Sequence, residues 1–287
     1  MSNGIHRTIR RRVGNLKRAA LRNVKRARLH LNRLDQNTIL RSFKSFDSEP
    51  PKLLFVHSSL SACGYIVGGS VTVIQALLEW TDGNTLAMPT HTYCYPDQEG
   101  RPETFDPLCT PSRVGAVTDY FWRQPGVMRS LHPTHSLAAS GPLSEWLCNG
   151  HERCGTPCGS GTPYERLIEA DCAVLMFGAT MNSYTLFHTA EDAARVPYLY
   201  EPKQYRLFAK SADHSVITVQ MFRQDMSVPR RFRQMADWLE ERDVLSRRRL
   251  GAGELLFVPS SARVHQVLLQ AMDLDPYFLA EQVPALA

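Results

Sequence analysis

Short apolar runs that alternate with helical patterns constrain this chain more than any other feature. Each run is a few residues long and is bounded by glycine, proline or small polar residues, as expected of buried strands. These runs occupy residues 53–56, 83–90, 172–178 and 255–258. Apolar residues spaced by three and four positions predict helices at 71–78, 117–123 and 262–272. Because strands and helices alternate from residue 53 to residue 272, we expect a single α/β domain.

After Tyr205 the pattern changes and predicts a smaller β-rich elaboration. Residues 215–219 alternate between polar and apolar side chains, which is typical of a half-exposed strand, and a charged helix is expected near 229–242. Two residues mark expected helix starts. Ser70 is expected as the N-cap of the helix at 71–78, and Pro163 as the first residue of another helix.

The first 46 residues form a strongly basic segment. Residues 1–44 hold 13 of the 33 Lys and Arg residues and one of the 28 Asp and Glu residues, which leaves 20 basic against 27 acidic side chains in the remainder. Apolar residues stand at positions 9, 13, 16, 20, 24, 27, 31 and 34. This spacing predicts a basic amphipathic helix. We therefore expect a helical extension at 1–46 and a globular domain at 47–287, joined by the proline-containing stretch 47–51.

Several roles for this basic helix stay open. It could lie on an anionic membrane surface, contact a partner protein through residues 7–34, or pack on the domain. Nucleic acid is the least favoured partner, because no aromatic side chain interleaves the charges before Phe43. The sequence does not indicate an oligomeric state.

The sequence predicts a cytoplasmic protein, with peripheral membrane contact if the basic helix docks there. It contains no apolar run of about 18 residues, the length that a membrane-spanning helix needs. Its N-terminus lacks the apolar core of a secretory signal. The seven cysteines, an odd number, are therefore expected as reduced thiols.

His188 and Glu191 stand three positions apart at the start of a predicted helix that follows the strand at 172–178. On a helix this spacing places both side chains on one face. A carboxylate that fixes the tautomer of an imidazole, and stabilises its protonated form, makes the imidazole an oriented general base. The same spacing also suits an ordinary helix start with a surface histidine and a solvated glutamate, so both interpretations stay open.

The segment after the first strand has the composition of an anion-binding turn. Ser58 and Ser59 follow the strand, and Gly68 and Gly69 precede the next helix. Free backbone N–H groups at a helix N-terminus can hold a phosphate. However, the chain lacks the GxGxxG and GxxxxGK[ST] motifs, and any strand-to-helix turn favours the same residues.

Cys148, His151, Cys154 and Cys158 form a C-x2-H-x2-C-x3-C stretch. Thiolates and an imidazole could bind zinc. Four ligands within eleven residues leave little room for the two separated arms of a zinc site, so we expect three loop cysteines, a surface histidine and no metal.

Taken in order, these segments resemble the aminoglycoside 3-N-acetyltransferase family. The matching pieces are His57-Ser58-Ser59-Leu60 with Gly64 and Gly68-Gly69; Met88-Pro89-Thr90; Phe105-Asp106-Pro107 with Thr110-Pro111-Ser112; Gly115; Arg129-Ser130 with His132-Pro133-Thr134-His135-Ser136; Gly161-Thr162-Pro163; Thr185 through His188 to Glu191; and Gly251 to Gly253 with Asp275-Pro276. The likeness lies in the order of these pieces and excludes the basic segment. Thr162 departs from the family, which usually has serine before this proline, and the stretch 148–158 is unusual for it.

The resemblance implies a single-domain α/β fold of the aminoglycoside 3-N-acetyltransferase type, distinct from the GNAT acyltransferase fold. Residues 248–253 fit the R-x-x-G-x-G pattern of GNAT enzymes, but a predicted strand follows them instead of the helix that those enzymes require. The resemblance also implies acetyl-CoA as co-substrate, no metal, and an amine of an aminoglycoside or related amino sugar as acceptor.

The resemblance further implies roles for individual residues. His188 and Glu191 map to the reaction centre. The expected CoA-binding residues are Ser58, Ser59, Gly68, Gly69 and Arg129, and the expected substrate-binding residues are His132, His135 and Thr185. Two alternatives stay open: an enzyme of this family that acylates a non-antibiotic amine, and a docking protein on a catalytically idle fold that uses the basic helix.

Overall fold

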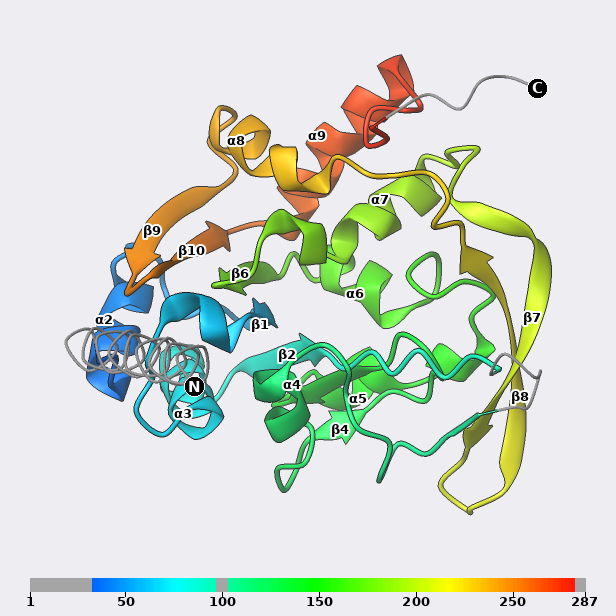
Figure 1. Ribbon diagram of the computed structural model, residues 1–287, viewed down its shortest axis with the longest axis horizontal. Helices are drawn as coiled ribbons and strands as arrows, with labels where there is room; N and C mark the ends of the chain where they lie inside the picture. The colour runs from blue at the N-terminus through cyan, green and yellow to red at the C-terminus, as the bar shows by residue number, and fades with distance from the viewer. Residues whose placement is uncertain (1–32, 97–102, 282–287) are drawn as a thin grey trace, which may run out of the picture.

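A seven-stranded mixed sheet forms the centre of the computed structural model, which describes residues 33–96 and 103–281 (Figure 1). The strand order is β4-β5-β2-β1-β6-β10-β9. Their bounds are β1 Leu53–Ser58, β2 Thr85–Pro89, β4 Met128–Arg129, β5 Leu137–Ser140, β6 Ala173–Phe177, β9 Ser246–Leu250 and β10 Gly253–Val258. The three central strands β2, β1 and β6 are parallel, and the outer strands pair in antiparallel fashion. The α/β class is therefore confirmed.

Helices cover both faces of this sheet because its central strands are apolar on both sides. Along β1, Leu53 and Phe55 pack into one hydrophobic cluster, whereas Leu54 and Val56 pack into the other. This alternation follows from the two-residue period of a strand. One face is covered by α2 (Gln36–Lys44), α3 (Ser70–Thr81) and α4 (Ala116–Phe121). The opposite face is covered by α5 (Ser144–Cys148), α6 (Pro163–Glu169), α7 (Leu186–Ala193), α8 (Met235–Glu240) and α9 (Ser261–Leu274).

A second sheet of three strands stands beside the first, in the order β3-β7-β8. It consists of β3 (Thr104–Phe105), β7 (Tyr200–Lys210) and β8 (Val216–Gln224). The long hairpin β7–β8 lies along one side of the domain (Figure 1). The expected β-rich elaboration is thus confirmed, and the end of β8 supplies residues to the site described below.

The structure begins with a segment that packs on the domain. Phe43 of α2 stacks on Trp80 of α3 with ring centroids 5.0 Å apart, and Leu34 and Ile39 are buried in the same cluster. Residues 34–46 therefore share the core of the domain, although the expected division between 46 and 47 stays a prediction. Positions 7–32 of the expected basic helix lie outside the described residues. Within residues 33–96 and 103–281, no helix is long and apolar enough to cross a membrane.

Some of the helix starts and lengths that the sequence predicted differ from those in the structure. Pro163 is the first residue of α6, as predicted, and Thr162 is its N-cap. The N-cap of α3 is Gly69 and not Ser70; Gly69 has φ +60°, a conformation that glycine adopts at low cost. The charged helix expected near 229–242 is shorter, with a 3₁₀ turn at Phe232–Gln234 before α8. Residues 248–253 form the β9–β10 hairpin, as their expected strand context required.

Candidate active site

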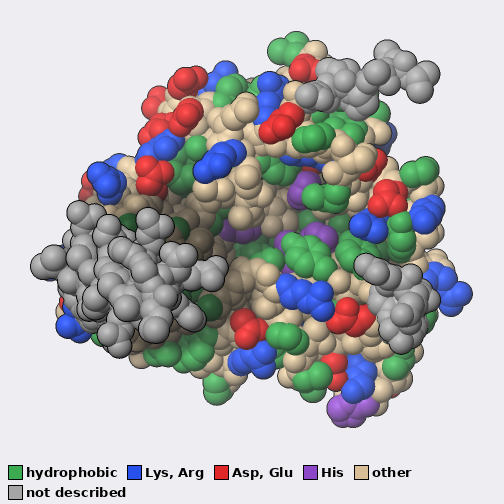
Figure 2. Space-filling view, in the orientation of Figure 1, with side chains coloured by type: hydrophobic (Ala, Val, Ile, Leu, Met, Phe, Trp, Pro, Cys, Tyr) green, Lys and Arg blue, Asp and Glu red, His purple; other side chains and the backbone are tan. Residues whose placement is uncertain are grey.

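Two cavities open at the carboxyl edge of the parallel strands β2, β1 and β6. One, of about 470 Å³, is lined by His57, His91, His135 and His188 among others, and we call it the histidine cavity. The other, of about 610 Å³, is lined largely by Ser58, Ser59, Ser61, Gly64, Gly115 and Ala116, and we call it the serine groove. Ser58, Val114 and Ser183 line both, so the two spaces adjoin. Figure 2 shows histidine side chains inside the hollow on this face. In open α/β sheets this edge is the usual place for ligands.

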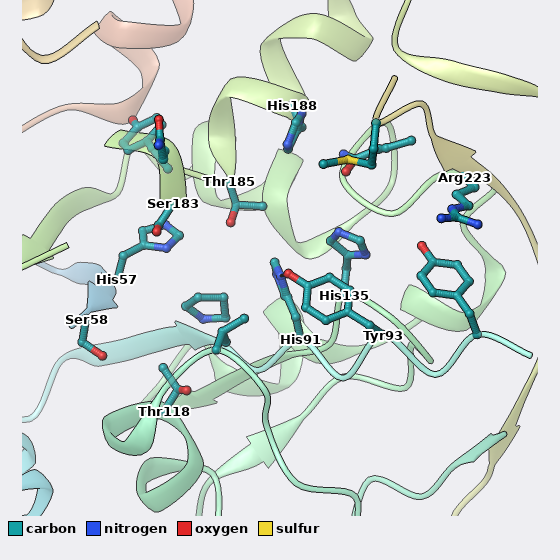
Figure 3. A pocket seen from close by; sticks show the side chains of 17 residues that line it. His57, Ser58, His91, Tyr93, Thr118, His135, Ser183, Thr185, His188 and Arg223 are labelled. Carbon is teal, nitrogen blue, oxygen red and sulfur yellow. Dashed lines mark hydrogen bonds between the residues drawn. The ribbon is translucent and has the colours of Figure 1, made fainter. Parts of the chain in front are cut away.

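His188 of α7 lines the histidine cavity (Figure 3), and Glu191 lies three positions further along the same helix. His188 Nδ1 lies 2.7 Å from Glu191 Oε2. Glu191 is 0% exposed and His188 19% exposed, so the glutamate is not the solvated residue of the alternative interpretation. Because the carboxylate accepts the Nδ1 proton, Nε2 of the neutral ring keeps the free lone pair.

Arg230 completes this arrangement from the loop after β8. Its Nε donates to Glu191 Oε1 at 3.3 Å, and its side chain is only 8% exposed. The guanidinium also lies 4.9 Å from the centre of the Tyr198 ring. A buried carboxylate needs such charge compensation. Sequence spacing gave no sign of Arg230, because it lies 39 positions from Glu191.

Thr185 and His135 also line the histidine cavity, as their expected role requires. The carbonyl of Thr185 accepts the backbone N–H of His188, which closes the first turn of α7. His135 Nδ1 lies 2.8 Å from the Thr134 hydroxyl. Burial lowers the pKa of His135 to about 3, so its ring is neutral near pH 7. Both residues can therefore act as neutral hydrogen-bonding groups towards a ligand.

Further cavity residues had not been singled out from the sequence. His57 precedes Ser58 at the end of β1, and His91 follows the end of β2. His91 Nε2 lies 2.8 Å from the Tyr164 hydroxyl, and burial lowers the pKa of His57 to about 3. The position of polar residues just after neighbouring parallel strands was a signal that could have identified both histidines. Arg223, at the end of β8, had no such signal.

Some expected site residues lie outside both cavities. His132 is fully buried, and its Nδ1 accepts the backbone N–H of His135 at 3.0 Å. Gly68 and Gly69 form the entry to α3 and do not line either space. Their expected ligand roles stay predictions.

Arg129 is also absent from both linings, and its guanidinium already has protein partners. It donates to the Thr90 carbonyl at 3.0 Å and to the Thr110 carbonyl at 2.6 Å. The Trp122 ring lies 4.4 Å from its central carbon. These contacts tie together loops behind the cavity, so they favour a structural role over the expected CoA contact.

The cysteine-rich stretch is part of the core. His151 was expected at the surface but is 0% exposed; it stacks on His132 with centroids 4.2 Å apart. Its Nδ1 lies 2.9 Å from the Ser130 hydroxyl and its Nε2 lies 3.2 Å from the Pro157 carbonyl oxygen. Both ring nitrogens are thus engaged. In the described part of the chain, no group of three or more His, Cys, Asp or Glu side chains is placed to hold a metal ion.

Small residues supply more than half of the lining of the serine groove. The Ser58 hydroxyl oxygen, at the junction with the histidine cavity, is buried and has no hydrogen-bond partner among the described residues. The backbone N–H of Ser59 already donates to the Phe177 carbonyl at 2.8 Å. A Cβ on Gly115 would stand 3.5 Å from the Ser58 carbonyl oxygen, and the φ of +125° at this position also favours glycine.

Comparisons with known proteins bear on this arrangement. A family model described as aminoglycoside 3-N-acetyltransferase matches residues 55–270. Aminoglycoside N(3)-acetyltransferase III from a Salmonella species is 32% identical over 183 residues, which cover 56% of this chain. The match spans 62% of that relative's length.

Solved structures are similar over most of the chain. The aminoglycoside acetyltransferase AAC(3)-IVa apoenzyme superposes with a TM-score of 0.75 at 26% identity, covering 88% of this chain and 93% of that one. A mutant of the same enzyme in complex with a gentamicin gives a TM-score of 0.74 at 26% identity, with 86% and 91% covered. AAC-IIIb bound to CoASH gives 0.73 at 21% identity, with 88% and 100% covered, and shows the shared fold alone.

Proposed function

Because the chain belongs to the aminoglycoside 3-N-acetyltransferase family, we propose that it transfers acetyl from acetyl-CoA to an amine of an aminoglycoside or related amino sugar. One observation carries the proposal: His188, paired with buried Glu191, lines a cavity that adjoins a second groove at Ser58. A transferase for two substrates needs two adjoining spaces, with a base at their junction or on the wall of the acceptor space.

His188 is the proposed general base. An amine attacks a thioester only as the free base, whereas sugar ammonium groups are largely protonated near pH 7. His188 Nε2 takes a proton from the attacking amine, and buried Glu191 stabilises the imidazolium that results. Arg230 pairs with the other oxygen of Glu191, so the buried carboxylate has a cationic partner besides His188.

The serine groove fits the slender pantetheine arm of CoA. Its described lining consists of serine, glycine and alanine residues together with Leu60, Tyr65, Ile66 and Val114, and its volume of about 610 Å³ leaves room for an unbranched chain. None of these lining residues is Lys or Arg, so we assign no cationic partner to the CoA phosphates within the groove.

Ser58 is the proposed oxyanion donor. Its buried hydroxyl has no other hydrogen-bond partner among the described residues, and it lies where groove and cavity meet. An O–H aimed at the developing oxyanion stabilises the tetrahedral intermediate. The backbone N–H groups of Ser59 and Ser183 are already donated to carbonyls of the protein.

The arrangement favours direct transfer without an acetyl-enzyme. The neutral amine nitrogen bonds to the carbonyl carbon and loses one proton to His188. The carbon–sulfur bond breaks, and the departing thiolate takes up a proton from the imidazolium of His188, directly or through solvent. Among the described residues lining the two spaces there is no cysteine, and the pKa of nearby buried Cys63 is raised to about 11 by burial. Ser58 has no base beside its hydroxyl within the described chain.

The test is thiol release from acetyl-CoA in the presence of aminoglycosides and amino sugars, together with calorimetric titration of CoA. The proposal requires CoA binding and acceptor-dependent thiol release. Binding without release by any of these amines would support instead a family member that acylates another kind of amine. Absence of both would overturn the proposed function. Mass spectrometry of enzyme mixed with acetyl-CoA alone should show no acetyl adduct.

A further inference from the structure

The serine groove lacks the charges that the phosphate end of CoA needs. CoA joins its pantetheine arm to a pyrophosphate and a 3′-phosphate, and proteins hold phosphates with cationic side chains or free backbone N–H groups. None of the described residues that line the groove is Lys, Arg or His. Residues 45–287 hold 20 basic against 27 acidic side chains, so the net charge of the domain does not attract an anion either. A cationic partner for these phosphates is therefore expected from another part of the chain.

The direction of bound CoA in the groove follows from the proposed chemistry. The acetyl group reacts beside Ser58, where the serine groove meets the histidine cavity. The pantetheine arm then runs into the part of the groove that the cavity does not share, and this part is lined by Gly64, Tyr65 and Ile66 among others. The phosphates consequently leave the groove near these residues.

The start of the described chain is anchored on this part of the groove. Leu34 is 5% exposed and forms an isolated β-bridge with Ile66. Its backbone N–H donates to the Tyr65 carbonyl at 3.0 Å, and its carbonyl accepts the backbone N–H of Val67 at 2.9 Å. Arg33, the residue before it, is exposed. The chain that precedes Leu34 is therefore tethered beside the serine groove.

The tethered chain carries most of the charge of the basic segment. Residues 7–33 hold 11 of the 33 Lys and Arg residues and none of the 28 Asp and Glu residues. Three of these cations, Arg26, Arg28 and Arg33, stand within eight positions of Leu34. Even a fully extended chain of eight residues spans about 28 Å at most, so attachment at Leu34 keeps these side chains within reach of the groove. Groups tethered in this way act at a high effective concentration.

We infer that the basic segment, through Arg26, Arg28 and Arg33, binds the phosphates of CoA where they leave the serine groove. This inference rests on the proposed function and adds a CoA contact outside residues 55–270, the part of the chain that the family model matches. Arginine suits the role because its guanidinium stays charged near neutral pH and donates two parallel hydrogen bonds to phosphate oxygens. The ligand of the basic segment is then the co-substrate of the enzyme itself.

The experiment compares acetyl-CoA with S-acetylpantetheine, which carries the same thioester without the phosphates. Thiol release with saturating gentamicin or sisomicin gives kcat and KM for each donor, and calorimetry gives the Kd of CoA without any acceptor. The full-length wild type is measured beside the triple variant Arg26→Gln, Arg28→Gln, Arg33→Gln.

The matched control removes three other positive charges, in the triple variant Lys52→Gln, Arg206→Gln, Arg263→Gln. All three side chains are exposed, and none of them lines the serine groove or the histidine cavity. Lys52 directly precedes the amino end of β1, whereas the groove opens at the carboxyl end of this strand. The control thus reproduces the change in net charge without a change beside the groove.

Replacement of the three arginines of the basic segment should raise KM for acetyl-CoA and Kd for CoA by about tenfold, as expected when three solvent-accessible charge contacts are lost. The variant should keep kcat with acetyl-CoA, and kcat/KM with S-acetylpantetheine, within about twofold of wild type, because the reacting groups are unchanged. The control variant should keep all four quantities within about twofold.

Two results would overturn the inference while upholding the proposed function. The first is an unchanged Kd for CoA in the variant of the basic segment, and the second is an equal rise of Kd in both variants, which would assign the effect to net charge. Wild-type protein that neither binds CoA nor releases thiol from acetyl-CoA would instead overturn the proposed function.

Discussion

Two histidines of this molecule lie in opposite environments. His188 touches a cavity, and its Nδ1 faces a buried carboxylate at 2.7 Å. His151 is fully buried, with one nitrogen near a serine hydroxyl and the other near a backbone carbonyl. The carboxylate orients the His188 ring, while burial lowers the pKa of His151 to about 3. The surroundings of His188 therefore suit proton exchange with a ligand, whereas those of His151 suit hydrogen bonding within the core.

The largest expected effect is the loss of kcat when His188 is replaced. His188→Ala should lower kcat by about 10²- to 10⁴-fold, because the general base is lost. Steady-state thiol release measures this loss, and CoA affinity from calorimetry should stay within about twofold. Unchanged turnover would remove His188 from the base role.

On the structural side, His151→Ala should lower the free energy of unfolding by about 2–4 kcal/mol, since it leaves a cavity beside His132 and two unpaired polar groups. Denaturant unfolding measures this. The folded fraction should keep kcat within about threefold; a loss of kcat as large as that of His188→Ala would show that the two histidines do not differ in kind.

Glu191→Gln sharpens the comparison by removing the charge but little volume. We expect kcat to fall by about 10- to 10²-fold, because the neutral amide no longer stabilises the imidazolium. The matched control is Glu201→Gln, which alters a carboxylate on β7 that is not in contact with His188. An equal loss in both variants would contradict a specific role for Glu191.

The smallest expected effect concerns pH. The pKa of His151 is about 3 when folded and 6.5 as its ordinary value, so the unfolded chain binds the proton first as pH falls. Stability is therefore retained above pH 6.5 and lost as pH falls from 6.5 towards 3. Each such buried imidazole contributes a slope of about 1.4 kcal/mol per pH unit. His151→Gln should flatten the measured slope by that amount; an unchanged slope would show that His151 is already protonated in the folded state.

Much of this arrangement could be predicted from local sequence patterns. The short apolar runs became β1, β2, β6 and β10, because their length and boundaries alone distinguish buried strands. The helical spacing of His188 and Glu191 predicted that both side chains share one face, and their contact depends only on one turn of α7; the burial of Glu191 was left open.

Long-range packing decided what the sequence could not reveal. Arg230 and Arg223 reach the site through folding of the segments around β8, which no local period encodes. Arg129 and His132 carry the residue types of a binding loop, yet the Arg129 guanidinium and His132 Nδ1 are engaged by neighbouring backbone. His151 was expected at the surface but is buried. Its residue type alone did not reveal this burial.

The pH dependence of kcat tests the central claim most directly. Wild type and His188→Gln, which retains a polar side chain without a titrating group, are compared at saturating acetyl-CoA and acceptor. If His188 is the base, kcat of His188→Gln is low throughout, and its acidic limb reflects only protonation of the acceptor amine and therefore differs from that of wild type. An acidic limb that persists unchanged in His188→Gln would show that another group takes the proton.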